Sequence, residues 1–130
     1  SNVVVDPLVM PVGAINTAGK QVFQIIHRLR TELKVNSSCG ASNISFGLPN
    51  RNGLNAAYLS MGIAAGMTSA IMNPLHEVEM QGVLGADVMM GHDPDCTRWI
   101  RRFRDPATAT TESSERGRRG GRRRRAQASA

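Results

Sequence analysis

Short apolar runs alternate along the chain with stretches in which apolar residues recur at helical spacing. The β-branched run at residues 3–5 ends at Asp6, a pattern typical of a buried parallel strand that gives way to a loop. Across residues 22–33 the apolar side chains recur three or four positions apart. This spacing predicts an amphipathic helix that packs one face on a sheet.

The same alternation continues further along the chain. A second strand is expected over about residues 35–46, and a loop at 47–51 separates it from a helix over about residues 53–65. Gly66 is placed to end that helix, because glycine readily adopts the left-handed conformation at a helix C-terminus. A short third strand is expected at residues 70–72.

Two more helices complete the pattern, one over about residues 75–90 and one that begins at Asp93 or Pro94. Strands that alternate with amphipathic helices indicate βα units and a parallel sheet, so the predicted fold class is α/β. Three strands alone would leave two sheet edges and much of both faces uncovered. We therefore expect residues 1–106 to be the C-terminal part of a larger domain.

Positive charge is concentrated in residues 107–130. The 130-residue chain is 41% hydrophobic and carries a formal net charge of +6, of which +5 comes from the arginines and glutamates of this segment. Because the segment has no aliphatic residue larger than alanine, it is expected to be a disordered basic tail. A tether to nucleic acid or another acidic surface is the alternative interpretation.

Composition argues against two other classes of protein. No apolar run reaches the roughly 20 residues of a membrane span, so no membrane association is expected. Cys39 and Cys96 lie far apart in the sequence and match neither a disulfide framework nor a zinc-site spacing. This cysteine usage favours a reducing, cytoplasmic setting.

Polar residues lie near the end of each expected strand: Asp6 for the first, Asn43 and Ser45 for the second, and Asn73 for the third. Because the carboxyl ends of parallel strands meet at one edge of a sheet, these side chains predict a site for a polar ligand. Asp6 can accept two parallel N–H bonds from an amidine-like heterocycle, and the Asn43 amide can follow a ring nitrogen through a change of protonation. Each residue also has a structural interpretation, as a turn cap or a loop hydrogen bond.

Several motifs of the chain resemble those of a known family. Residues 40–51 read GASNISFGLPNR, and LNAAYL at 54–59 and AAGMTSAIMNP at 64–74 follow. Together with VDPLVMPV at 5–12, they resemble the pterin-binding domain of methyltetrahydrofolate:corrinoid (cobalamin) methyltransferases. That domain also occurs in cobalamin-dependent methionine synthase and is related to dihydropteroate synthase. The resemblance extends from about residue 3 to about residue 105.

The resemblance implies a (β/α)8 TIM barrel, of which this chain would supply about three βα units and a terminal helix. It also implies transfer of the N5 methyl group of 5-methyltetrahydrofolate to the cob(I)alamin of a corrinoid protein. Asp6 matches the family aspartate that binds the amino-pyrimidine edge of the pterin, and Asn43 matches the catalytic asparagine that assists N5. Ser42 and Arg51 belong to the same motif and are further candidates for pterin contact.

The resemblance also bears on what the chain needs from elsewhere. The N-terminal strands of the family, which supply other pterin contacts, have no counterpart in the sequence, so the chain is expected to be incomplete and inactive alone. No corrinoid-binding motif is present, so the cobalamin is expected on a partner corrinoid protein. A homodimer is left open.

Two other interpretations stand beside this one. A dihydropteroate synthase-like pterin-binding protein is less favoured, because that branch uses a strand-end lysine where this chain has Asn43. The other is a non-catalytic remnant whose tail, residues 107–130, binds nucleic acid or an acidic surface.

Overall fold

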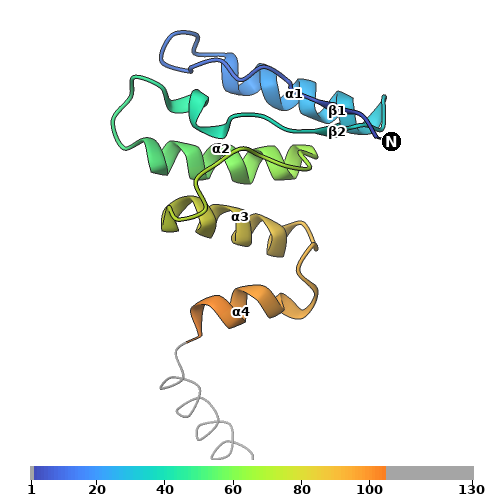
Figure 1. Ribbon diagram of the computed structural model, residues 1–130, viewed down its shortest axis with the longest axis vertical. Helices are drawn as coiled ribbons and strands as arrows, with labels where there is room; N and C mark the ends of the chain where they lie inside the picture. Colours follow the sequence, from blue (N-terminus) through green and yellow to red (C-terminus); the bar gives the residue numbers. More distant parts are fainter. Residues whose placement is uncertain (1, 105–130) are drawn as a thin grey trace, which may run out of the picture. The chain divides into compact units, whose positions relative to one another are not determined.

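The computed structural model describes residues 2–104, and the basic tail expected at 107–130 lies outside them (Figure 1). The chain divides into two compact units, with the boundary between Asp95 and Cys96. The described fold is mixed α/β, mostly helical, with a small parallel sheet, which confirms the predicted class at this level. None of the helices in this part of the chain is long and apolar enough to cross a bilayer.

The elements follow the predicted order. In the first unit they are β1 Val4–Val5, α1 Ala18–Thr31, β2 Asn36–Ser37, the 3-10 helix η1 Ala41–Ser45, α2 Arg51–Ala65 and α3 Glu77–Met89. The 3-10 helix η2 Pro94–Cys96 and α4 Thr97–Phe103 come next. The predicted helices and the first two predicted strands are therefore confirmed in kind, with changes in their bounds, whereas the third predicted strand is not formed as a strand.

The second strand is shorter than expected, and the prediction of a strand over 35–46 is wrong beyond Ser37. Only the two residues of β2 pair with β1, in parallel register. Residues 41–45 form η1 instead. The intervening residues 38–40 are serine, cysteine and glycine, which are small and not β-branched, so they give a strand little side-chain surface for cross-strand packing.

The other corrections concern residues 51 and 70–72. Helix α2 begins at Arg51, two residues before the expected start, so Arg51 belongs to the helix rather than to the loop. The expected third strand is reduced to one parallel bridge between Ile71 and Gly40. The Ile71 N–H donates to the carbonyl of Cys39 at 2.8 Å, so this segment still runs alongside the β2 segment.

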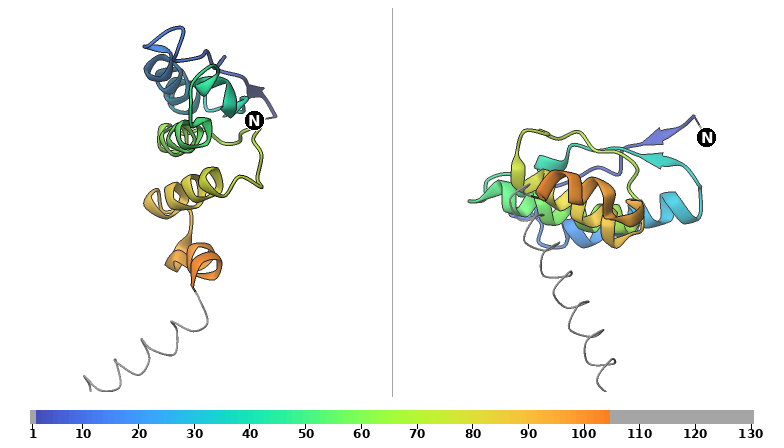
Figure 2. Two further views of the ribbon diagram at one scale, coloured as in Figure 1. Left: turned by 90° about the vertical axis from the view of Figure 1, so that its left-hand side faces the viewer. Right: turned by 90° about the horizontal axis from the view of Figure 1, so that it is seen from below.

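The core of the first unit lies between its helices and its strands. Helix α2 lies between α1 and α3 in Figure 1, and Figure 2 shows both strands on one side of these helices. Helix α1 buries Val22, Ile26 and Leu29, three members of the predicted stripe. Ile25 and Leu33 of that stripe are exposed, the latter because it lies beyond the end of the helix. The buried face is thus narrower than the sequence pattern.

Gly66 ends α2 as the sequence predicts. Gly66 follows α2 in the left-handed conformation, with φ of 110°, and its N–H bonds back to the carbonyl of Gly62. In α4 the rings of Trp99 and Phe103 contact each other with centroids 4.4 Å apart, as their spacing on one helix face requires.

Candidate functional site

Asp6 sits on a tight turn directly after β1. Its Oδ1 accepts the N–H of Leu8 at 2.9 Å, and Leu8 takes the left-handed conformation with φ of 60°. A residue other than glycine pays about 1–2 kcal/mol for this backbone conformation. The side chain of Asp6 is exposed, and within residues 2–104 its Oδ2 makes no hydrogen bond. Asp6 therefore caps the turn with one oxygen and presents the other to solvent.

Asn43 and Ser42 lie side by side on η1, in the connection that follows β2, and both are exposed. The Asn43 amide lies close to Gly40, where an added Cβ would be 3.4 Å from its Nδ2. In the described part of the chain no side chain hydrogen-bonds the Asn43 amide. Because β1 and β2 pair in parallel, the segments carrying Asp6 and Asn43 leave the same end of the sheet.

Arg51 holds η1 from the first turn of α2. Its Nη2 donates to the carbonyl oxygen of Ser42 at 2.7 Å, and its Nε donates to the hydroxyl of Ser45 at 3.1 Å. Its guanidinium also lies 5.7 Å from the ring centroid of Phe46. These charge-assisted contacts stabilise the turn that carries Asn43.

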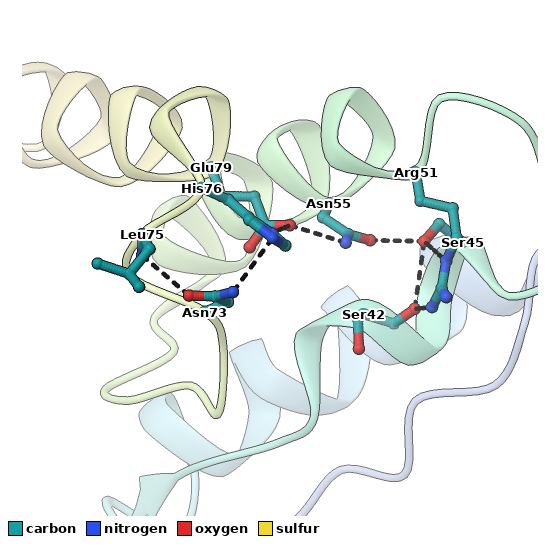
Figure 3. Close-up of polar contacts among 8 residues, drawn as sticks. All are labelled: Ser42, Ser45, Arg51, Asn55, Asn73, Leu75, His76 and Glu79. Atoms are coloured by element: carbon teal, nitrogen blue, oxygen red, sulfur yellow. Dashed lines mark hydrogen bonds and ion pairs between the residues drawn. The ribbon is translucent and has the colours of Figure 1, made fainter.

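A chain of buried polar side chains leads from η1 to α3 (Figure 3). The hydroxyl of Ser45 donates to Asn55 Oδ1 at 2.7 Å, and Asn55 Nδ2 donates to Glu79 Oε1 at 2.9 Å. We call Ser45, Asn55 and Glu79 the buried polar chain. His76 Nδ1 lies 3.2 Å from the same carboxylate oxygen of Glu79, and Asn73 Nδ2 lies 3.1 Å from His76 Nε2.

A cavity of about 450 Å³ opens beside this chain. It is lined by Ser42, Arg51, Asn52, Asn55, Ile71, Met72, Asn73, His76 and Glu79. Of the residues predicted from the sequence, the structure brings Ser42, Arg51 and Asn73 to this cavity, whereas Asp6 and Asn43 do not line it. Asn73 also caps its own turn, because its Oδ1 accepts the N–H of Leu75 at 3.0 Å.

Three residues of this site were not predicted from the sequence: Asn55, His76 and Glu79. A signal was available for Asn55, because it lies three and four positions before Tyr58 and Leu59, on the face that α2 buries. Glu79 likewise lies seven positions before Ala86, the other buried residue of α3. A polar side chain in a buried helical stripe indicates a hydrogen-bonded network.

The sulfur of Cys39 lies 3.0 Å from the Tyr58 hydroxyl in the core. Burial raises the pKa of the Cys39 thiol; the hydrogen bond with Tyr58 opposes this rise, and the negative charge of Asp6 adds to it. Burial also raises the pKa of Tyr58, and the hydrogen bond to Cys39 adds to this rise. Both groups are therefore neutral at physiological pH and act in packing rather than as nucleophiles.

The exposed groups of this region are suited to binding by hydrogen bonds. An exposed carboxylate oxygen at Asp6 and an exposed amide at Asn43 together offer both donor and acceptor capacity. Among residues 2–104 no group of three or more His, Cys, Asp or Glu side chains is arranged to hold a metal ion.

Comparison with known proteins gives one similarity that bears on this chain. No family model matches the chain. The chain is, however, similar to a methyltransferase. That protein is the methylcorrinoid:tetrahydrofolate methyltransferase of Eubacterium limosum; the alignment of 103 positions shows 31% identity and covers 77% of this chain and 37% of that protein. The similarity supports the resemblance to folate- and corrinoid-dependent methyltransferases, and the chain spans little more than a third of the length of this relative.

Proposed function

We propose that this chain is part of a methyltransferase that moves a methyl group between N5 of tetrahydrofolate and a corrinoid carried by a partner protein. The observation that carries the proposal is the parallel pairing of β1 and β2, after which Asp6 and Asn43 follow at one end of the sheet. Both side chains are exposed there. The similarity to the Eubacterium limosum methyltransferase supports the same function.

The fold proposed for the whole protein is a (β/α)8 barrel, with residues 1–106 as its C-terminal part. Three successive parallel segments with a helix after each one support this proposal. Val3, just before β1, and Val4, within it, expose 53% and 58% of their surface, as expected where further barrel strands would pack. In this fold ligands bind at the carboxyl ends of the strands, where Asp6 and Asn43 follow.

Each of the four candidate residues has a proposed role. Asp6 binds the amino-pyrimidine edge of the pterin through Oδ2, while Oδ1 keeps the turn. Asn43 hydrogen-bonds N5. Ser42 contacts the pterin through its exposed hydroxyl, and Arg51 borders the site while it holds η1 in place.

The chemistry explains why an amide is useful at N5. When the methyl group leaves tetrahydrofolate, the bond between the methyl carbon and N5 breaks and its electron pair goes to N5, while a cobalt(I) lone pair forms the new bond to carbon. N5 is a poor leaving group unless it carries a proton or a strong hydrogen bond. Asn43 supplies that stabilisation without changing its own charge, since an amide can donate or accept.

The direction of transfer is part of the proposal. The resemblance implies transfer from 5-methyltetrahydrofolate to cob(I)alamin, whereas the name of the relative gives methylcorrinoid as the donor. In that direction the N5 lone pair attacks the methyl carbon and the cobalt–carbon electron pair returns to cobalt. The two directions share one transition state, so Asn43 acts on N5 in both. We propose that the chain alone, which supplies one part of the barrel, catalyses methyl transfer in neither direction.

Replacement of Asn43 tests this function. In the protein expressed from its natural reading frame, Asn43→Ala is expected to lower kcat for methyl transfer about 10²–10³-fold, as loss of one preorganised hydrogen bond does elsewhere. The affinity for tetrahydrofolate should change far less. Gln24→Ala, which removes an exposed amide from α1, is the matched control and should leave both unchanged. Wild-type turnover in Asn43→Ala would remove Asn43 from the mechanism.

A further inference from the structure

The buried polar chain joins three elements that are separate in sequence. Arg51 Nε donates to Ser45, the hydroxyl of Ser45 donates to Asn55, and Asn55 donates to Glu79. Each donor thus points from the guanidinium of Arg51 toward the carboxylate of Glu79 (Figure 3). Hydrogen bonds aligned in this way polarise one another, so the orientation of each amide and hydroxyl is fixed by its neighbours.

The burial of this chain makes an exclusively stabilising role a poor explanation. Ser45 is 0% exposed, and Asn55 and Glu79 are each 3% exposed. Removing a carboxylate and an amide from water is costly, and well-packed apolar residues at such positions are often as stable or more stable. Within residues 2–104 every buried side-chain polar atom has a partner, so the network is complete. A complete buried network imposes one geometry.

The carboxylate of Glu79 is itself fixed from two sides. Glu79 is the third residue of α3, after the N-cap residue His76. Besides the amide of Asn55, the ring nitrogen Nδ1 of His76 contacts the same Oε1 at 3.2 Å. The positive end of the helix dipole favours an acidic side chain in this first turn. Glu79 is therefore a fixed acceptor to which Asn55 can be aligned.

We propose that Glu79 is a positioning residue for Asn43. Glu79 orients Asn55, Asn55 orients the Ser45 hydroxyl, and Ser45 with Arg51 fixes η1, the turn on which Asn43 is presented. Asn43 makes no side-chain hydrogen bond of its own within the described residues, so its direction depends on the turn beneath it. This inference rests on the proposed function and extends it by naming the residues that aim the amide at N5.

The test compares two substitutions that differ in whether an acceptor remains. Glu79→Gln keeps a carbonyl oxygen that can accept the hydrogen bond of Asn55, whereas Glu79→Met, of similar volume, has no good acceptor there. In the ¹⁵N-labelled chain, the side-chain amide resonances of Asn43 and the backbone amides of η1 should shift in Glu79→Met and keep their wild-type positions in Glu79→Gln. Glu77→Met, an exposed position on the same helical turn, is the control and should leave them unchanged.

A second variant covers the case in which Glu79→Met does not fold. In Asn55→Leu combined with Glu79→Met both polar partners become apolar, a change that is often nearly neutral for stability. Folding should then be retained while the Asn43 resonances shift as in the single variant. Wild-type Asn43 resonances in a folded variant that lacks the Glu79 acceptor would overturn the proposal.

Kinetics separate this proposal from the proposed function. In the protein from its natural reading frame, Glu79→Met should lower kcat up to about 10²-fold, as a misplacement of about 1 Å can, with little change in KM. Glu79→Gln should restore most of that loss. If Glu79→Met shifts the Asn43 resonances while the wild-type protein transfers no methyl group, the proposed function is contradicted and the structural coupling stands. Active wild-type protein with an unchanged kcat in Glu79→Met would contradict the positioning role alone.

Discussion

Tyr58 carries a buried hydroxyl group that makes the stability of the core depend on pH. It is 2% exposed, contacts the Cys39 thiol, and stacks on Phe23 with ring centroids 5.5 Å apart. In the unfolded chain Tyr58 and Cys39 release protons near their ordinary pKa values, about 10 and about 8.5. Because burial raises both pKa values in the folded chain, the native state holds these protons to higher pH.

This linkage predicts alkaline destabilisation. Above about pH 8.5 the unfolded state binds fewer protons than the native state, so the free energy of unfolding falls as pH rises. Below that pH the contribution of these two groups to stability is fully present. The chain has one tyrosine, so tyrosinate absorbance should appear only as the chain unfolds. Urea unfolding of Tyr58→Phe between pH 7 and pH 11 should show a weaker loss of stability than wild type. Parallel pH profiles for the two proteins would refute this linkage.

At the residue scale, exposed polar residues were easier to predict from the sequence than buried polar residues. Asp6 could be predicted as a strand-end residue, because a polar side chain after an apolar run is visible in the sequence, whereas Asn43 lies on η1, six positions after β2 ends. Asn55 and Glu79 were missed, because a polar residue within a helix is ordinarily solvent-exposed, and only the partner on another helix reveals its burial. The pairing of Asn55 with Glu79 depends on a tertiary contact between two helices, and the local sequence pattern of either helix does not reveal it.

At the scale of elements, α2 and α3 pack closely at Gly82. A Cβ added at Gly82 would lie 2.8 Å from the carbonyl oxygen of Ala56 and 3.1 Å from Oγ of Ser60. The hydroxyl of Ser60 also donates to the carbonyl oxygen of Gly82 at 2.9 Å. The absence of a side chain at Gly82 therefore allows the two helices to approach, and this approach brings Glu79 within reach of Asn55.

Two glycine-to-alanine substitutions test this packing. Gly82→Ala is expected to destabilise the chain by about 1–3 kcal/mol, because the new methyl group meets backbone that cannot move aside easily. Gly19→Ala in α1 is the matched control, since its Cβ would make ordinary contacts at 3.7 Å and longer. It should stabilise the chain by about 0.5–1 kcal/mol through helix preference. Equal effects of the two changes on urea unfolding would contradict the close-packing account.

Helices were easier to predict than strands in this chain. The apolar spacing over residues 22–33 predicted α1, because a long helix contains several periods of its pattern. The region 35–46 has no such repetition, and its change from β2 to η1 depends on hydrogen bonds with Arg51 and Ile71 from elsewhere in the chain. Short strands are set by neighbours that sequence pattern alone does not identify.

For the whole molecule, the central claim is that Asp6 and Asn43 belong to a pterin site in a partial barrel. The chain matches 37% of the length of its Eubacterium limosum relative. The fold class was predicted from the order of elements, whereas the resemblance to a family came from the motifs at 5–12, 40–51, 54–59 and 64–74. The roles of Asp6, Ser42, Asn43 and Arg51 stay predictions.

Ligand titration of one conservative variant tests this claim most directly. Asp6→Asn retains an oxygen to accept the N–H of Leu8, so the turn is kept while the charge and the second acceptor are lost. In the protein from its natural reading frame, isothermal titration should show that wild type binds 5-methyltetrahydrofolate and that Asp6→Asn binds it roughly 10- to 100-fold more weakly, as expected for a lost hydrogen bond to a charged group. Glu32→Gln, an exposed carboxylate on the α1 side, should bind as wild type does. Equal affinity in Asp6→Asn and wild type, or no binding by wild type, would contradict the account.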